Sequence, residues 1–244
     1  MIKELTYNLD DEKIYGKAYI PDNDETKYPT IILSHGLSLN HTYMIEYAEK
    51  LQKYGIAVYI FDFRGGGYDS KSDGKISDMT LPTEVEDLNF VIDNIKKEDF
   101  VDTNQLYIGG HSQGGLISTL VAKDRDDIGA LFLFAPAYVI PSDVNETKKR
   151  SKNVLNLMPE YLGEKYINSA SNLDIYEIIK DIDNSVYIFH GFKDERVPVD
   201  YVVKADKIFS DSVLYIYEDA EHRFTSQVKD DVTSIINEVI FNSK

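Results

Sequence analysis

The stretch QLYIGGHSQGGLIS, residues 105–118, sets one serine among four glycines between two apolar runs. Gly110 and Gly114 lie two positions either side of Ser112, which gives the pattern G-x-S-x-G. A serine at a sharp turn from strand to helix has strained backbone angles, and only small neighbours let the two elements approach so closely. The pattern therefore predicts a strand, an exposed serine hydroxyl and a helix in immediate succession, the arrangement called a nucleophile elbow.

Six short apolar runs, rich in β-branched and aromatic residues, recur along the chain and alternate with helical patterns. They are TIILS (30–34), IAVYIFDF (56–63), LYIG (106–109), ALFLFA (130–135), VYIFH (186–190) and VLYIYE (213–218). Runs that are apolar on both faces suit the strands of a parallel sheet buried under helices. The first twenty residues alternate instead about the polar turn DDEK, which predicts an antiparallel hairpin. The expected fold class is therefore α/β, with a mostly parallel sheet, helices on both faces and an N-terminal antiparallel hairpin.

The length and composition favour one domain over residues 1–244, because 244 residues of which 43% are hydrophobic can bury a sizeable single core. Within it, a helix is expected to start at a capping box formed by Thr83 and Glu86. Residues from about 136 to 184 contain no convincing core strand. So long an excursion in a compact α/β domain predicts an inserted lid at the active-site edge of the sheet.

The charge balance and the residue types exclude several classes of function. The 42 acidic residues outnumber the 26 basic ones, and Lys and Arg cluster only in KKR at 148–150, so no nucleic-acid partner is expected. The first residues lack the apolar core of a signal peptide, and the longest apolar run, residues 130–140, is too short to span a bilayer. We therefore expect a cytoplasmic protein with no membrane partner. The absence of cysteine removes disulfides, thiolate catalysis and cysteine-ligated zinc.

The elbow serine needs a base and a carboxylate, because its hydroxyl is a weak nucleophile at neutral pH. His222 is the candidate base among five histidines, since it lies between the last strand and the last helix, where the elbow opens. Asp194 follows the strand VYIFH directly and is the candidate acid. Asp219 competes for that role but lies only three residues from His222, within the same turn. The order Ser112, Asp194, His222 is the order of the triads on this kind of fold.

Two backbone N–H groups are candidates to stabilise an oxyanion. The N–H of Gln113 begins the helix after the serine, where the helix dipole favours negative charge. The N–H of Leu37, in the loop SHGLSLN (34–40), is the second, and Gly36 lets the backbone approach a substrate there. Acyl transfer by these groups requires neither a metal nor a cofactor, and none is expected.

Together these segments resemble the α/β-hydrolase superfamily over nearly the whole chain, and they are most similar to bacterial serine esterases of the cinnamoyl (feruloyl) esterase group. The resemblance rests on LSHGLSLN (33–40), FDFRGGGYDS (61–70), GGHSQGG (109–115), FAPA (134–137), HGFKDERVP (190–198) and EDAEHRF (218–224). At Gly66 the sequence departs from relatives, which commonly carry a histidine there. The resemblance implies an α/β-hydrolase fold and a serine carboxylic ester hydrolase that acts through an acyl-enzyme on hydroxycinnamoyl or other small aryl or short-chain esters.

The same resemblance implies that the lid grips a phenolic acyl group. In such relatives an aspartate soon after the APA segment and a tyrosine on the insertion bind the ring hydroxyl, and Asp143 and Tyr166 match those positions. Each also has a structural alternative, since Asp143 can cap a helix and Tyr166 is one of 18 tyrosines. Aromatic side chains in a lid suit an aromatic acid and an alkyl chain equally, because both bind mainly by apolar burial.

Other functions stay open. A general short-chain carboxylesterase or a monoacylglycerol-type lipase would use the same three residues. A serine oligopeptidase has a similar elbow and a similar HGxxDxxVP segment (190–198), although such enzymes usually add a large N-terminal domain. A ligand-binding relative without catalysis is disfavoured by the complete triad. The small-molecule ester is the partner expected, and a homodimer is compatible with the sequence.

Overall fold

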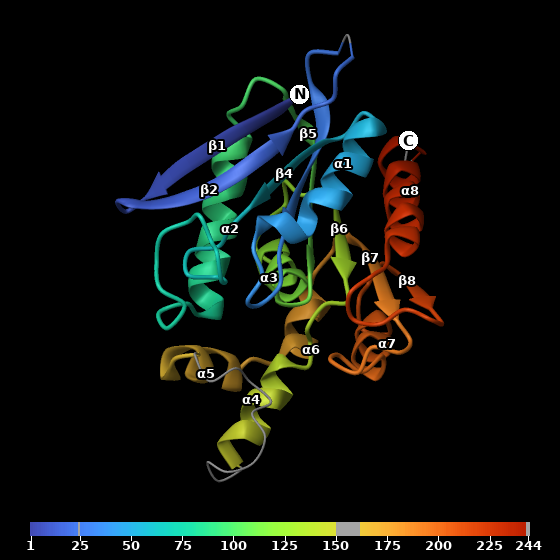
Figure 1. The fold of residues 1–244 in the computed structure, drawn as a ribbon. Coiled ribbons are helices and arrows are strands. Elements are labelled where there is room, and N and C mark those ends of the chain that lie inside the picture. Colours follow the sequence, from blue (N-terminus) through green and yellow to red (C-terminus); the bar gives the residue numbers. More distant parts are fainter. Residues whose placement is uncertain (24, 150–161, 243–244) are drawn as a thin grey trace.

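The computed structural model describes residues 1–23, 25–149 and 162–242, and an eight-stranded sheet forms its centre (Figure 1). The strands are β1 (Ile2–Leu9), β2 (Glu12–Tyr19), β3 (Tyr28–Ser34), β4 (Ala57–Phe61), β5 (Val101–His111), β6 (Ala130–Phe134), β7 (Ser185–Gly191) and β8 (Ser212–Tyr217). Their order across the sheet is β1-β2-β4-β3-β5-β6-β7-β8. β2 pairs antiparallel with β1 and β4, whereas all other neighbours are parallel. The expected mostly parallel sheet with an N-terminal antiparallel hairpin is therefore confirmed.

The hairpin turns at Asp10 and Asp11, whose φ angles are +48° and +67°. A two-residue turn with positive φ at both central positions has the twist that matches the flanking strands, and aspartate tolerates this conformation. The turn places Leu9 opposite Glu12 and thereby fixes the register of β1 on β2.

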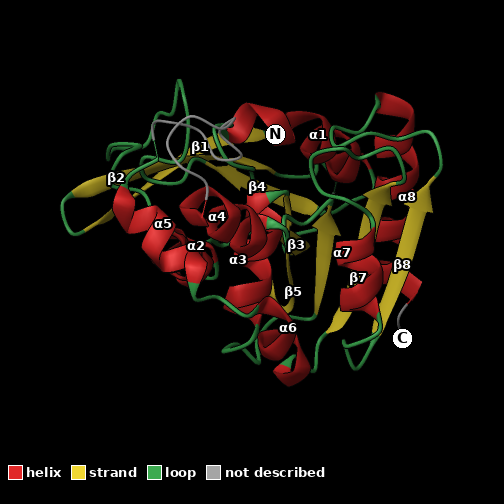
Figure 2. Ribbon diagram, turned by 90° about the horizontal axis from the view of Figure 1, so that it is seen from below, coloured by secondary structure: helices red, strands yellow, loops and turns green. Residues whose placement is uncertain are grey.

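Helices cover both faces of the sheet (Figure 2). They are α1 (Ile45–Lys53), α2 (Leu81–Ile95), α3 (Gln113–Ala122), α4 (Ile140–Lys149), α5 (Glu164–Ser171), α6 (Ile175–Ile178), α7 (Asp200–Asp206) and α8 (Ser226–Asn242), with short 3₁₀ turns η1 (His41–Met44) and η2 (Ile179–Asp181). On one face Ile31 and Leu33 of β3 share a core with α1 and with Ile236 of α8. On the other face Ile32 shares a core with Leu88 of α2 and with helices α3 and α7. This alternation along one strand explains why its sequence is apolar on both faces.

Helix α2 begins earlier than the sequence analysis expected, so the Thr83/Glu86 capping box was wrong. The N-cap is Thr80, which has an extended backbone conformation. Its side-chain hydroxyl accepts the backbone N–H of Thr83. Pro82 sits in the first turn, where its fixed φ suits a helix and its missing N–H costs nothing. The earlier start places Glu84 in the first turn, and its side chain is buried.

The segment from residue 136 to 184, called the cap segment below, contains α4, α5, α6 and η2 and joins β6 to β7. Figure 1 shows α4 and α5 beyond the carboxyl ends of the strands, the edge at which the elbow lies. Residues 150–161 of this segment lie outside the described residues. Helix α5 packs on α4 and α2, which ties the cap segment to the sheet-bound helices. Among the described residues, none of the helices has both the length and the apolar character needed to cross a bilayer.

Candidate active site

Ser112 occupies the turn between β5 and α3. Its φ is +55° and its ψ is −119°, a conformation that costs a non-glycine residue about 1–3 kcal/mol and persists only where the surroundings enforce it. A Cβ built on Gly110 would lie 2.4 Å from the carbonyl carbon of Gly114, and one built on Gly114 would lie 2.4 Å from the carbonyl oxygen of Ser34. The two glycines are therefore needed because strand and helix backbones touch at these points.

Three side chains that follow different strands meet at this turn. His222, in the loop between β8 and α8, has its Nε2 3.0 Å from Ser112 Oγ. Its Nδ1 lies 2.7 Å from Asp194 Oδ2, three residues beyond the end of β7. The side chain of Asp219 is 91% exposed and pairs with Lys193. The structure thus brings Ser112, His222 and Asp194 together in series, and it leaves Asp219 outside the series.

The carboxylate of Asp194 is fixed and charged. Its Oδ1 accepts the backbone N–H groups of Arg196 and Val197 at 2.9 and 2.8 Å. Burial alone would raise the pKa of Asp194, but hydrogen bonds from His222 and Val197 and the electrostatic interaction with His222 hold that pKa below its usual value. An anionic Asp194 orients the imidazole of His222 with Nδ1 protonated and Nε2 facing the serine hydroxyl.

The peptide group between Gly36 and Leu37 is held through its carbonyl oxygen. The carbonyl of Gly36 accepts the Nδ1–H of His35 at 2.9 Å and the N–H of Leu39 at 3.1 Å. In a trans peptide the carbonyl and the following N–H point in opposite directions. These two bonds therefore make the Leu37 N–H point away from the His35 ring and the Leu39 N–H. A Cβ on Gly36 would lie 3.0 Å from the Cβ of Ser112, which shows how closely this loop lies against the nucleophile.

His35 was not among the residues that the sequence analysis selected, although it directly precedes Gly36. Its Nε2 accepts the N–H of Phe63 at 3.2 Å, which leaves the proton on Nδ1 for the Gly36 carbonyl. Burial lowers the pKa of His35, and the ring is therefore neutral. A Cβ on Gly66 would lie 2.6 Å from the Cβ of Phe63 and 3.1 Å from the His35 ring. A glycine at position 66 therefore leaves room for this ring.

His111 directly precedes Ser112 in the elbow and contacts the loop of the base. Its Nε2 lies 2.9 Å from the backbone carbonyl of His222, and the two ring centroids are 4.7 Å apart. Burial lowers the pKa of His111 to about 3, and the electrostatic interaction with His222 lowers it too. A neutral His111 therefore supports the loop that carries His222 without placing a positive charge beside the base.

Asp143 and Tyr166 both lie in the cap segment, and both are buried. Asp143, in the first turn of α4, forms an ion pair of 2.7 Å with Arg196, two residues from Asp194. Tyr166, on α5, donates its hydroxyl to the side-chain oxygen of Gln113 at 2.5 Å. Each residue is therefore connected to a neighbour of the serine–histidine–aspartate series.

A surface pocket of about 590 Å³ opens beside His222 and Asp194. Phe192 lines this pocket and is 61% exposed, and the other residues that line it are charged residues and His222. Across the described ranges, no group of three or more histidine, aspartate or glutamate side chains is arranged to hold a metal ion. The groups that the site presents are a hydroxyl, an imidazole, a carboxylate and backbone N–H groups.

A family model described as "Serine aminopeptidase, S33" matches residues 26–192, more than half of the chain. The chain belongs to this family. The matched range contains Leu37, Ser112 and Gln113, and it ends shortly before Asp194 and His222.

Solved structures of α/β-hydrolases are similar over the whole chain. Est1E from Butyrivibrio proteoclasticus with ferulic acid bound has a TM-score of 0.84 and 28% identity, covering 96% of this chain and 98% of that one. DcsB in complex with its substrate analogue has a TM-score of 0.81 at 18% identity, with 99% of both chains covered. The α/β hydrolase domain-containing protein 10 from mouse has a TM-score of 0.80 at 19% identity, covering 99% and 100%. The last two share the fold alone, and together with Est1E they confirm the expected α/β-hydrolase fold. The family match and the similarity to Est1E identify the chain as a hydrolase.

Curated relatives match over only part of their own length. An uncharacterized 31.7 kDa protein from Escherichia coli is 26% identical over 167 residues, which are 66% of this chain and 57% of that protein. The acylamino-acid-releasing enzyme of Rattus norvegicus is 25% identical over 72% of this chain and 25% of its own length. Dipeptidyl peptidase 8 of Homo sapiens is 26% identical over 86% of this chain and 24% of its own length. The chain thus spans about half of the first relative and about a quarter of the other two.

Proposed function

We propose that this hydrolase is a serine carboxylic ester hydrolase that acts through an acyl-enzyme on Ser112. The observation that carries the proposal is the series Asp194–His222–Ser112, with contacts of 2.7 and 3.0 Å. A serine, an imidazole and a charged carboxylate in this order activate the hydroxyl for attack on an acyl carbon.

Each group has a definite step in the proposed reaction. The Oγ of Ser112 bonds to the ester carbonyl carbon while His222 Nε2 takes the hydroxyl proton. Asp194 stabilises the imidazolium that forms. The N–H groups of Leu37 and Gln113 receive the oxyanion of the tetrahedral intermediate. The C–O bond to the alcohol then breaks, and His222 returns its proton to the leaving oxygen. A water molecule then attacks the acyl carbon and gives its proton to His222. The bond to Ser112 Oγ breaks, His222 returns the proton to Ser112, and the acid is released.

Hydroxycinnamoyl esters, with a feruloyl or p-coumaroyl group, are the substrate class we favour. Support comes from the similarity to Est1E with ferulic acid bound, at 28% identity over nearly the full length of both chains. In this proposal the cap segment is the lid over the acyl group, and Asp143 and Tyr166 meet the ring hydroxyl. The competing assignment is a general short-chain carboxylesterase or monoacylglycerol-type lipase, in which the cap segment supplies only an apolar wall.

A serine peptidase is the second candidate, because the family description and two of the curated relatives name peptide-cleaving enzymes. The chain covers only about a quarter of those two relatives, so their substrates do not transfer directly. Hydrolysis of p-nitrophenyl acetate without hydrolysis of aminoacyl-p-nitroanilides supports the esterase, and the reverse preference contradicts it. Fluorophosphonate labelling that is lost in Ser112→Ala supports the nucleophile, and unchanged labelling in that variant would exclude it. A homodimer remains a prediction, which analytical ultracentrifugation tests.

A further inference from the structure

The side chain of Gln113, the residue directly after the nucleophile, is held at both ends of its amide. Its Oε1 accepts the hydroxyl of Tyr166 from α5 at 2.5 Å. Its Nε2 donates to Glu84 Oε2 from α2 at 2.7 Å and lies 3.8 Å from the sulfur of Met79. All three hydrogen-bonded side chains are 1% exposed or less. A buried amide with a partner at each end has one preferred position, because leaving either partner unpaired would cost a desolvated polar group.

This anchoring acts at the point where the backbone needs it. Ser112 has a φ of +55°, and such strain persists only where neighbouring structure enforces it. The next residue, Gln113, carries one of the two N–H groups that we assign to the oxyanion. Fixing its side chain to two other helices fixes its Cα, and with it the direction of that N–H.

We propose that Glu84 and Tyr166 are positioning residues that hold the nucleophile elbow and the Gln113 N–H through the Gln113 side chain. The inference rests on the proposed serine hydrolase mechanism and adds to it a link between the cap segment and the oxyanion donor. Through Tyr166, the seating of α5 on the body of the protein becomes a condition for efficient acylation.

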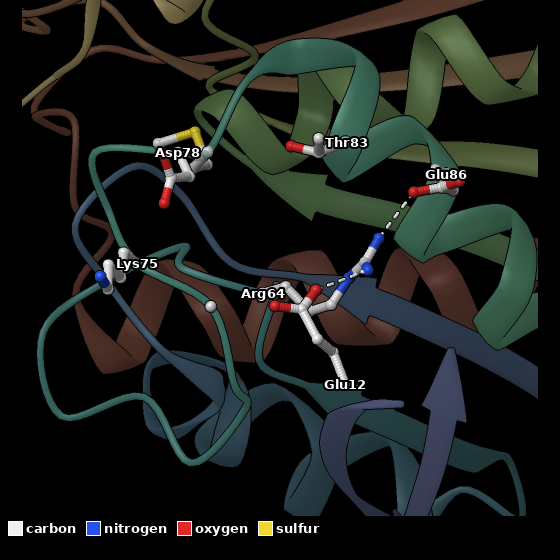
Figure 3. Close-up of a pocket in the computed structure, with 8 residues that line it drawn as sticks. Glu12, Arg64, Lys75, Asp78, Thr83 and Glu86 are labelled. Atoms are coloured by element: carbon white, nitrogen blue, oxygen red, sulfur yellow. Dashed lines mark hydrogen bonds and ion pairs between the residues drawn. The ribbon is translucent and has the colours of Figure 1, made fainter. Parts of the chain in front are cut away.

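Glu84 serves this role as a neutral group. Burial raises the pKa of Glu84 well above its usual value; the bond from Gln113 opposes this, and the carboxylate of Asp87 adds to it. Arg64, which pairs with Asp87, is also paired with Glu86 and Glu12. Figure 3 shows Arg64 reaching Glu86 in a pocket of about 450 Å³ beside α2. Met79 lines the same pocket and contacts the Gln113 amide, so it separates that amide from the pocket. Because a neutral Glu84 acts as a hydrogen-bond acceptor, a glutamine at position 84 should keep the bond from Gln113, whereas a leucine should not.

The chain offers a matched control for the loss of a tyrosine hydroxyl. Tyr138 forms a buried hydrogen bond of 2.9 Å with Thr119, which lies on α3 like Gln113 but more than a turn further along. Both side chains are fully buried. Tyr138→Phe therefore removes a comparable bond to the same helix without touching the elbow.

The experiment compares Tyr166→Phe, Glu84→Leu, Glu84→Gln and Tyr138→Phe in the full chain with p-nitrophenyl acetate. This ester has no ring on its acyl group, so a loss of turnover cannot come from a lost contact with a ring hydroxyl. We expect Tyr166→Phe and Glu84→Leu to lower kcat about 10- to 100-fold with KM changed by less than about threefold, since loss of a whole oxyanion donor costs about 10²–10³-fold. Fluorophosphonate labelling of Ser112 should slow in parallel, and Glu84→Gln should restore kcat to within about threefold of wild type.

Thermal unfolding of each variant separates positioning from stability. We expect Tyr138→Phe and Tyr166→Phe to lower Tm by similar amounts and only Tyr166→Phe to lower kcat. Equal kcat for these two variants overturns the proposal, as does a Glu84→Gln variant as slow as Glu84→Leu. If Glu84→Leu does not fold, Tyr166→Phe alone decides. Failure of the parent mechanism is distinguishable, because it would appear as undiminished labelling or turnover in Ser112→Ala.

Discussion

His111 Nε2 donates a hydrogen bond to the backbone carbonyl of His222 across 2.9 Å, so the residue before the nucleophile supports the loop of the base. The two loops are far apart in the sequence and meet only because β5 and β8 deliver them to the same edge of the sheet. His111 can make this contact as a neutral ring, because burial lowers its pKa to about 3.

This lowered pKa predicts a loss of stability in acid. The unfolded chain can protonate His111 below its ordinary pKa, while the folded chain cannot until about pH 3. Stability is therefore lost as the pH falls from about 6.5, at about 2 kcal/mol between pH 6.5 and pH 5 for this one group. The amide of His111→Gln can still donate a hydrogen bond but does not titrate. The free energy of unfolding in urea should therefore change by that much less between the two pH values in this variant than in the wild type. An unaltered pH dependence would contradict the assignment. Some dependence should remain, because burial also lowers the pKa of His35 and His190.

His35 should be essential for rate although it does not touch the triad. His35→Ala removes a donor from the Gly36 carbonyl and frees the peptide that carries the Leu37 N–H. We expect kcat for p-nitrophenyl acetate to fall about 10- to 100-fold, with a small change in KM. His41 is the matched control, since it is also buried and hydrogen-bonded but to Asp62. If His41→Ala and His35→Ala slow kcat equally in folded protein, the role assigned to His35 is wrong.

The choice between the two carboxylates near His222 can be tested directly. Asp194→Asn should lower kcat by about 10⁴-fold, because the amide favours the wrong imidazole tautomer and cannot stabilise the imidazolium. Asp219→Asn removes only an exposed pair with Lys193, which is worth little. Steady-state kinetics of both variants should therefore differ by orders of magnitude. A greater loss in Asp219→Asn would reverse the assignment.

Asp143 provides the test of substrate class. If its carboxylate meets a ring hydroxyl, methyl ferulate should have a higher kcat/KM than methyl cinnamate, and Asp143→Ala should reduce the ratio by an amount equivalent to about 1–3 kcal/mol. Arg196→Gln is the control, because it breaks the same ion pair but keeps the carboxylate. A preference for butyrate or longer alkyl esters, unaffected by Asp143→Ala, would instead indicate a general carboxylesterase.

The fold and the three residues of the candidate series follow from local patterns. The six strands β3 to β8 each contain an apolar run, and Ser112, Asp194 and His222 each follow one of them, where parallel strands deliver their loops to a common edge. The start of α2 could not be predicted as well, since Thr80 and Thr83 are both suitable N-caps and the choice depends on how Pro82 fits the first turn.

The supporting contacts could not be found from the sequence. The bond from His35 to Gly36, the bond from His111 to His222 and the two partners of Gln113 depend on which side chains the packed structure brings within 3 Å. Tyr166 illustrates the difference, because its position in the cap segment predicts a substrate contact but gives no sign of the bond from its hydroxyl to Gln113.

Detection of the covalent intermediate is the most direct test that Ser112 is the nucleophile. The protein is mixed with p-nitrophenyl butyrate, quenched in acid during turnover and analysed by intact-mass and peptide mass spectrometry, with Ser112→Ala in parallel. We expect a mass increase equal to one butyryl group on the peptide that contains Ser112, and neither adduct nor appreciable turnover in the variant. Undiminished turnover by Ser112→Ala, or an adduct that maps to another residue, would contradict it.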